Sequence, residues 1–281
     1  MRGTVSASRY QPILAAESYI WIQRFHARHE TLADGVAEMC QGFRQAGFKR
    51  VELDSDFLAA DLRAATLDEF KKNRLQLLSV YANSTMHTPT EAEQSIAEIV
   101  TLAQALAGTG FQAIVTDPSP RPDRQPKSAT ELSLQARSLN RLGEQLRKLG
   151  IRLMIHHHTP ELADHARQWR YELAHTDPGL VLCVVDVDWA FRGGQNPLAF
   201  IKACGKRLAC LHLRNDRNGV WMEDFGPGEI DYQPIAQYLR QMGYRGYLVV
   251  ELAYEKKTKV SRPLVADLRR SRLYAEKVFA V

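Results

Sequence analysis

Val181-Leu-Cys-Val-Val-Asp186 is a short, almost wholly apolar run that ends in an aspartate. A similar run lies on each side of it in the sequence, Arg152–His156 before it and Leu208–His212 after it, and each of these ends in a histidine. Runs of this length and composition are typical of strands buried in a parallel sheet, because both faces of such a sheet are covered. Five more runs complete a set of eight predicted strands: Tyr19–Arg24, Arg50–Leu53, Leu75–Tyr81, Ala113–Thr116 and Tyr247–Glu251.

Segments with helical periodicity separate these strands. Apolar residues share one helix face in the sets Leu32, Val36, Met39, Cys40, Phe43 and Leu132, Leu139, Leu142, Leu146, Leu149. Two capping boxes, Thr90 with Glu93 and Ser128 with Glu131, are predicted to begin helices. Eight strand and helix units in 281 residues predict an α/β protein, a closed (β/α)8 TIM barrel in a single domain.

The predicted domain spans residues 1–281, with about residues 1–17 as an N-terminal extension. No GxGxxG motif follows the first predicted strand, which argues against a dinucleotide-binding fold. No apolar stretch approaches the roughly 18–20 residues of a membrane-spanning helix, so we expect no membrane partner. Because the N-terminal segment also lacks the apolar run of a secretory signal, we expect a cytoplasmic location, the alternative being an export signal already removed.

Cysteine spacing and charge exclude further classes of protein. The four cysteines show no CxxC spacing and lie within apolar patterns, so we expect neither a disulfide framework nor a thiolate zinc site. The formal net charge of +5 comes from Lys256–Lys277, where eight basic residues stand against Asp267 and Glu276. We expect this segment to be a solvated helix face, with an anion or partner site as the alternative, and we expect no nucleic-acid partner. A homo-oligomer is left open.

Polar side chains recur at the carboxyl ends of the predicted strands. Four consecutive strands end in His156, Asp186, His212 and Glu251. Because a closed barrel brings its strand ends together around one mouth, we expect these four side chains to meet. Two imidazoles and two carboxylates suit a divalent cation, so the sequence predicts a site for one such ion.

These strand ends and the segments after them also resemble a known family. The motifs that carry the resemblance are Ile155–Glu161 (IHHHTPE), Val185–Trp189 (VDVDW) with Arg192-Gly-Gly194, Leu211–Asp216 (LHLRND), Gly226–Tyr232 (GPGEIDY) and Val249–Glu251 (VVE). Together they look like the xylose-isomerase-like barrels, a superfamily that includes sugar phosphate isomerases and epimerases, inosose dehydratase and endonuclease IV. The resemblance extends from about Ser18 to the C-terminus and is more specific for the superfamily than for a substrate.

The resemblance implies a set of metal ligands. Family members hold the metal with Glu, Asp, His and Glu at the ends of strands 5 to 8, and the last three match Asp186, His212 and Glu251. His156 stands at the usual position of the first Glu, as in members with a histidine-rich strand 5 such as inosose dehydratase. Strand alternation puts His156 and His158 on one side, so we take His156 as the ligand and His158 as a base or substrate contact. The reverse assignment is the alternative. The implied cofactor is one divalent ion, Mn, Co, Mg or Zn.

The remaining candidates surround this predicted centre. Glu52 resembles the family's strand 2 carboxylate near the substrate and is predicted to be catalytic, together with Glu251 and His158. Asp188 is expected to orient a ligand histidine. The candidate substrate contacts are His87, Trp189, Arg192, Arg214 and Glu223.

The implied activity is that of an isomerase or epimerase acting on a sugar, keto-sugar or cyclitol, so the expected partner is a small carbohydrate. A divalent ion polarises a ketone, a base removes the adjacent proton, and an enediolate forms. Loss of a β-hydroxyl from the same enediolate makes a dehydratase, a lyase, the main alternative. An endonuclease IV-like nuclease is less favoured, because Trp189 stands where its zinc site needs a histidine. A non-catalytic sugar-binding barrel is the third class.

Overall fold

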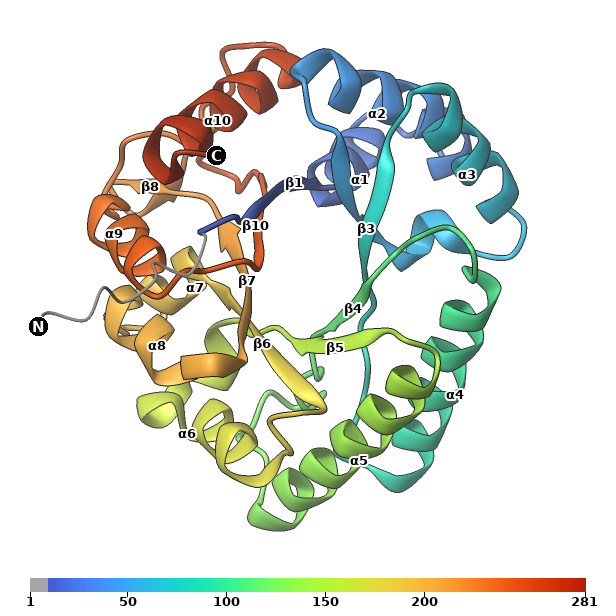
Figure 1. Ribbon diagram of the computed structural model, residues 1–281, viewed down its shortest axis with the longest axis vertical. Coiled ribbons are helices and arrows are strands. Elements are labelled where there is room, and N and C mark those ends of the chain that lie inside the picture. The colour runs from blue at the N-terminus through green and yellow to red at the C-terminus, as the bar shows by residue number, and fades with distance from the viewer. Residues whose placement is uncertain (1–9) are drawn as a thin grey trace, which may run out of the picture.

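Eight parallel strands close into a barrel in the computed structural model, which describes residues 10–281 (Figure 1). The strands are β1 (Ile13–Glu17), β2 (Arg50–Asp54), β3 (Gln76–Tyr81), β4 (Ala113–Thr116), β5 (Arg152–Ile155), β6 (Val181–Asp186), β7 (Leu208–Leu213) and β10 (Tyr247–Val250). Around the barrel they follow the order β1-β10-β7-β6-β5-β4-β3-β2. The predicted fold class, a single-domain α/β TIM barrel, is confirmed.

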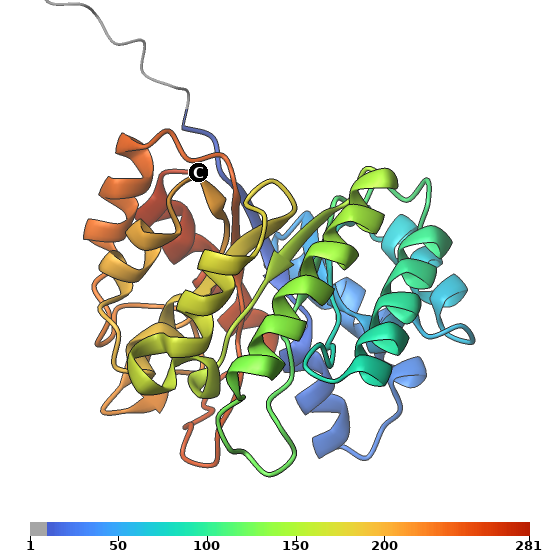
Figure 2. The same ribbon diagram turned by 90° about the horizontal axis from the view of Figure 1, so that it is seen from below.

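A ring of helices covers the outside of the barrel (Figure 1). These helices are α1 (Tyr19–Ala27), α2 (Leu32–Ala46), α3 (Arg63–Lys72), α4 (Pro89–Ala105), α5 (Ala129–Lys148), α6 (Thr159–His175), α8 (Pro197–Cys204), α9 (Gln233–Gln241) and α10 (Leu264–Phe279), with short 3-10 turns at Ser55–Leu58 and Gly205–Arg207. After β6 the chain forms the short helix α7 (Val187–Arg192), and after β7 the two-stranded hairpin β8 (Asp216–Arg217) and β9 (Val220–Trp221). The long loops after β4 and β10 project from the same end of the barrel (Figure 2).

The first strand lies earlier in the sequence than predicted. Tyr19–Arg24 was expected to be a strand, but it belongs to α1, where Trp21 and Phe25 are buried one helical turn apart. A short apolar run cannot be distinguished from a buried helical segment by periodicity alone. The true strand β1, with the sequence ILAAE, contains two alanines of low strand propensity; Ala15 fits the narrow barrel interior and Ala16 packs on the outer face. The predicted N-terminal extension to residue 17 is therefore too long, since Ile13–Glu17 is part of the barrel; residues 1–9 lie outside the described residues.

One predicted capping box is confirmed and the other is wrong. The Ser128 side chain accepts from the Glu131 N–H, and the Glu131 side chain accepts in return from the Ser128 N–H. The helix predicted to begin at Thr90 begins earlier, with Thr88 before Pro89. Proline suits the first helical position because its missing N–H would have no partner there.

The strands bury apolar side chains on both faces. Alternate residues fill the barrel interior, among them Ala15, Leu78, Val115, Met154, Val184 and Val249. The other face of each strand packs against the helices in a larger apolar cluster. All four cysteines are buried, as their apolar surroundings in the sequence predicted. Within residues 10–281, none of the helices combines the length and the apolar content needed to cross a lipid bilayer.

Two glycines of the Gly226-Pro-Gly228 motif provide a matched test of packing in the loop after β7. A Cβ on Gly228 would lie 2.3 Å from the Asp216 backbone oxygen and 2.6 Å from the Asn215 side chain, whereas a Cβ on Gly226 would meet nothing closer than 3.7 Å. Asn215 cross-links this loop, because its amide group bonds both Gly226 and Ile230. We expect Gly228→Ala to lower the free energy of unfolding by about 1–3 kcal/mol, as overpacking does. Urea unfolding of both variants checks this, and equal effects would contradict it.

Candidate metal centre and substrate cavity

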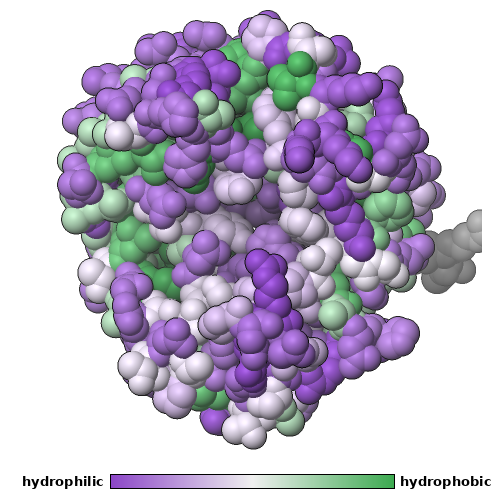
Figure 3. All heavy atoms as spheres, turned by 180° about the vertical axis from the view of Figure 1, so that it is seen from behind, coloured by the Kyte–Doolittle hydropathy of each residue, from purple (hydrophilic) through white to green (hydrophobic). Residues whose placement is uncertain are grey.

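The carboxyl end of the barrel contains a cavity of about 250 Å³. Its walls are formed by Glu17, Tyr19, Asp54, Tyr81, Asn83, His156, His158, Trp189, His212, Arg214, Trp221 and Glu251. A hollow lies at the centre of this end of the molecule, surrounded mainly by hydrophilic residues (Figure 3). The loops after β4 and β10 lie at the same end of the barrel as this cavity. Barrel enzymes place their active sites at this end, in the loops that follow the strands.

Strand alternation explains why polar side chains reach this cavity. His156, Asp186 and Glu251 each come two residues after an interior apolar residue, namely Met154, Val184 and Val249. Because successive side chains of a strand point to opposite faces, each of these polar groups points into the barrel at its carboxyl end. His157 points the other way and packs against Trp169 and Phe200 outside the barrel.

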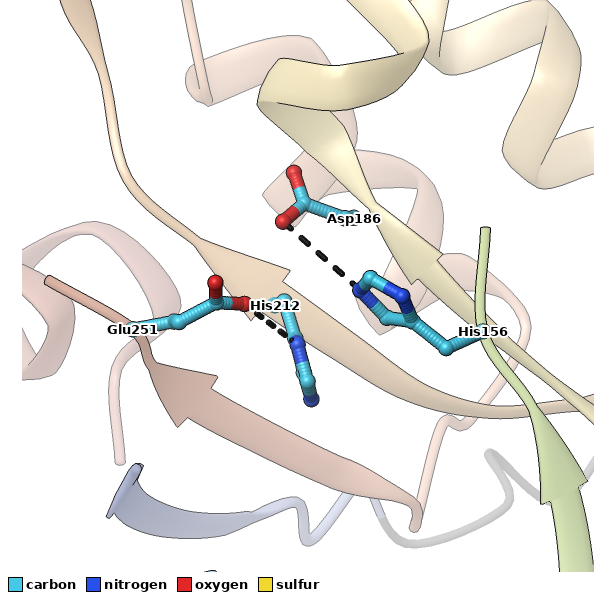
Figure 4. Close-up of side chains that lie close together, drawn as sticks. All are labelled: His156, Asp186, His212 and Glu251. Carbon is cyan, nitrogen blue, oxygen red and sulfur yellow. Dashed lines mark hydrogen bonds and ion pairs between the residues drawn. The ribbon is translucent and has the colours of Figure 1, made fainter. Parts of the chain in front are cut away.

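Four of these side chains form one cluster (Figure 4). His156, Asp186, His212 and Glu251 each place one donor atom within 4.8 Å of the others. His156 Nε2 lies 3.8 Å from Asp186 Oδ2, and His212 Nδ1 lies 2.6 Å from Glu251 Oε2. The donors come from four strands adjacent in the barrel, and all four residues are buried. Two further groups of three possible ligands overlap this cluster. Glu52 and Cys210 form one group with His212, and Asp117 and His158 form the other with His156, so all of them belong to one centre.

The charge states of three members of the cluster match a cation site. Burial would raise the pKa of Asp186 and of Glu251, but the Arg214 guanidinium and His212 together outweigh it and hold both pKa values below their ordinary range. Arg214 Nη2 lies 2.5 Å from Asp186 Oδ2 and 3.0 Å from Glu251 Oε1. Burial lowers the pKa of His156 well below its ordinary value, and His156 Nε2 is buried without a hydrogen-bond partner. Ionised carboxylates and a neutral, unpartnered imidazole are what a divalent ion needs.

Burial would lower the pKa of His212, but the Glu52 charge and the hydrogen bonds of the ring together raise it well above its ordinary value, so His212 would release a proton on binding the ion. With that proton released, the residues present fit such an ion.

His158 lies beside the cluster and is held by Asp117. Its Nδ1 is 3.0 Å from Asp117 Oδ2, and its ring packs edge-on against Trp189. Burial opposes the charged form of His158, but the Asp117 carboxylate outweighs it and raises the pKa to about 9. With Nδ1 engaged, Nε2 is the nitrogen that remains for a molecule in the cavity.

An aromatic wall forms the other side of the cavity. Trp189 and Trp221 pack edge to face with ring centroids 5.2 Å apart, and the Arg214 guanidinium lies over both rings. Trp221 Nε1 donates to Asp188. Asp188 thus binds this tryptophan and Arg192, and the expected role of orienting a ligand histidine is wrong.

Four residues predicted to be catalytic or to contact the substrate do not line the cavity, and the proposed metal ligand Asp186 is not among the residues that line it either. Glu52 lies beneath it, fully buried, where it accepts from Ser79 and sits 2.8 Å from His212 Nε2. Arg192 is held by Asp188, Asp216 and Glu255. Glu223 accepts from Ser261 and pairs with Arg262. His87 is buried beyond β3, outside the set of cavity residues. Charged residues on loops form ion pairs and hydrogen bonds with nearby residues, and the sequence alone does not show which pairs form.

Six cavity residues were missed by the sequence interpretation: Glu17, Tyr19, Asp54, Tyr81, Asn83 and Trp221. The sequence predicted the first strand at Tyr19–Arg24, so Glu17 was not expected to lie at a strand end. The correct strand would have revealed it, because Glu17 follows the interior residue Ala15 by two positions. Asp54 likewise follows Glu52 by two positions on β2. Trp221 comes from the hairpin after β7, and no strand pattern indicates it.

Comparison with known proteins agrees with this geometry. The family model described as a xylose isomerase-like TIM barrel matches residues 41–275. The chain belongs to this family. The resemblance recognised in the sequence motifs is thereby confirmed.

Three similar proteins are an enzyme matched in sequence and two enzymes matched in structure. An inosose dehydratase of Clostridium botulinum is 23% identical over 279 residues, which cover 89% of this chain and 91% of that protein. A sugar phosphate isomerase/epimerase from Parabacteroides distasonis has a TM-score of 0.73 at 19% identity, with 98% and 96% of the two chains covered. A D-allulose 3-epimerase from a Methylomonas species has a TM-score of 0.76 at 13% identity, with 97% and 99% covered. Each is named as an enzyme, and the two structures support the fold.

Proposed function

We propose that this protein is a divalent-metal-dependent enzyme that forms an enediolate from a hydroxy-ketone of a sugar or cyclitol. The observation that carries the proposal is the cluster of His156, Asp186, His212 and Glu251, of which His156, His212 and Glu251 line the cavity. A volume of about 250 Å³ is smaller than the ~300–1,000 Å³ of pockets for drug-sized ligands and suits a single sugar ring.

These four residues would hold the ion. A divalent ion there supplies Lewis acidity toward a ketone oxygen and its neighbouring hydroxyl, which makes the adjacent C–H more acidic. Its charge would also lower the pKa of His158, whose ring centroid is 4.8 Å from that of His156.

The other cavity residues have roles that follow from their contacts. His158 removes the α-proton with Nε2, because Asp117 holds Nδ1 and fixes the ring orientation. Trp189 and Trp221 cover one face of the sugar ring and exclude water, and Arg214 binds an oxygen of the substrate. Glu52 supports the ring of His212 from below.

The products depend on the step after proton removal. Reprotonation on the other face of the carbon gives an epimer, and reprotonation of the neighbouring carbon gives an isomer. Loss of a β-hydroxyl gives a dehydrated ketone. The name of the Clostridium botulinum relative, inosose dehydratase, supports dehydration as the second candidate activity.

Proton exchange tests the proposal. The protein, reconstituted with Mn²⁺, Co²⁺, Mg²⁺ or Zn²⁺, is incubated in deuterated water with keto-sugars, inososes and 3-keto-glycosides. We expect NMR to show metal-dependent loss of an α-proton signal from at least one of them. Absence of exchange with every metal and every ketone would refute the enediolate mechanism.

The basic segment Lys256–Lys277 bears on the charge of the substrate. Arg262, Arg270 and Arg272 pair with carboxylates, whereas Lys256, Lys257 and Lys259 are exposed on the loop after β10. The segment is thus part solvated surface and part ion-pair network. Replacing the three lysines with Gln is expected to leave turnover of a neutral ketone nearly unchanged, because exposed charges outside the cavity contribute little to its binding. Steady-state kinetics check this; a rise in KM for phosphorylated substrates alone would indicate an anion site.

A further inference from the structure

The cavity wall formed by β1 and β2, beside the metal cluster, contains a pair of carboxyl groups. The four proposed ligands belong to β5, β6, β7 and the end of β10, whereas Glu17 ends β1 and Asp54 ends β2. Both Glu17 and Asp54 line the cavity. None of the functions assigned above uses either residue.

The contacts of this pair hold the two groups together. The Glu17 and Asp54 carboxyl groups end two neighbouring parallel strands and contact the same hydroxyl group. Ser18 lies between them, since its Oγ donates to Asp54 Oδ2 at 2.5 Å and is 3.5 Å from Glu17 Oε1. The backbone N–H groups of Tyr19 and Asp54 complete the arrangement, the first donating to Glu17 and the second to Ser18. Within residues 10–281, no lysine, arginine or histidine forms an ion pair with either carboxyl group.

Such a pair retains a proton. Glu17 is only 2% exposed. Burial raises the pKa of Glu17 well above its ordinary value, and the neighbouring Asp54 raises it further, followed by the charges of Glu251 and Glu52. Burial also raises the pKa of Asp54, with a contribution from Asp56. Two adjacent carboxylates in a buried site do not both ionise. Burial and Asp54 raise the pKa of Glu17 more than Glu251 does. A cation bound at Glu251 would therefore leave the main causes of the raised pKa in place.

We infer that Glu17 is the general acid that directs the enediolate to dehydration, with Asp54 as the residue that keeps it protonated. The inference rests on the proposed function and deepens it by assigning the step after proton removal. Tyr81 also lines the cavity, but burial raises its pKa, so it is a far weaker acid than a carboxyl group. Glu17 is thus the cavity residue suited to protonate a departing hydroxyl.

The proposed step balances in atoms and charge. His158 takes the proton from the carbon next to the ketone, and the C–H electron pair forms the enediolate. The ketone then re-forms, a C=C bond forms between the α- and β-carbons, and the C–O bond to the β-hydroxyl breaks. The departing oxygen takes the Glu17 proton and leaves as water. Tautomerisation of the resulting hydroxy-enone gives a 1,2-diketone, and proton exchange with solvent restores His158 and Glu17. No oxidant or second substrate is required.

The experiment separates the two steps by using Glu17→Gln in the manganese-loaded protein with an inosose as the probe. Gln retains an oxygen that can accept from the Tyr19 N–H but has no acidic proton. We expect α-proton exchange in deuterated water and manganese content to stay close to wild type, while the rate of diketone formation falls by about 10²–10⁴-fold, the usual range for losing a general acid. The matched control is Asp61→Asn, which removes an exposed carboxyl in the turn before α3, outside the cavity, and is expected to leave both rates unchanged.

Each of the other possible results contradicts either the role of Glu17 or the proposed enediolate function. Unchanged diketone formation in Glu17→Gln, or equal loss of exchange and diketone formation with metal retained, refutes the general-acid role of Glu17. A wild-type protein that exchanges the α-proton without forming diketone refutes it as well, although the proposed enediolate function would stand. A wild-type protein that shows no exchange refutes the proposed function itself.

Asp54→Asn provides a second test that does not depend on the Glu17 variant. A general acid works only while protonated, so elimination is lost as pH rises through the pKa of Glu17. Removing Asp54 eliminates the largest neighbouring charge, leaving Glu251 and Glu52, so that pKa falls. We expect the loss of elimination to move to lower pH while α-proton exchange keeps its wild-type pH profile. An unmoved elimination profile in a folded, metal-loaded variant would refute the role of Asp54.

Discussion

Asp186→Ala and His212→Ala are each expected to weaken divalent-metal binding by at least about 100-fold while the barrel stays folded. Replacing residues that only orient metal ligands already costs about 10–100-fold in affinity, and these two side chains supply donor atoms of the cluster. Neither side chain fills the apolar interior or the space between strands and helices, so packing is preserved. Metal analysis after dialysis, together with circular dichroism and thermal unfolding, provides the measurement.

Glu223→Gln is the matched control for these variants. It also alters a polar residue that the sequence placed at the mouth, but its carboxylate is bound to Ser261 and Arg262 away from the cluster. We expect it to retain wild-type metal content. Stoichiometric metal in both Asp186→Ala and His212→Ala would contradict the ligand assignment.

The histidines of the strand 5 segment should separate into a ligand and a base. His156→Ala is expected to lose metal, because His156 Nε2 belongs to the cluster and has no other partner. His156→Glu should lose less affinity than His156→Ala, since it restores an anionic ligand for the cation. His158→Ala should retain metal yet lose about 10²–10⁴-fold in α-proton exchange, the usual contribution of a general base.

Metal content and exchange rates of these three variants decide between the two assignments. His157→Ala is not a suitable control, because His157 packs between Trp169 and Phe200 in the apolar layer. If metal survived His156→Ala and disappeared in His158→Ala, His158 would be the ligand, and a different base would have to be sought.

Much of the fold follows from local patterns. The predicted strands that match β2 to β7 and β10 begin and end within a residue or so of the observed ones, because each apolar run ends where a polar group reaches the barrel mouth. The same alternation that buries Val184 and Val249 places Asp186 and Glu251 two residues later on the same side. Strand 1 could not be located in this way, since Ile13–Glu17 has a weaker strand pattern than the helical segment after it.

Chain order and side-chain alternation, both properties of the sequence, determined which strand ends could carry a cation site. The tertiary structure alone decided which charged residues remain available to a ligand. Arg192 and Glu223 were as plausible as Arg214 in the sequence, but they are bound by Asp216 and Arg262, whereas Arg214 reaches Asp186 and Glu251. Glu17 and Asp54, which are 37 positions apart, became an acid pair only because β1 and β2 are neighbours in the closed barrel. Ion pairs and shared protons depend on distances of a few ångströms between segments remote in sequence, and closure of the barrel sets those distances.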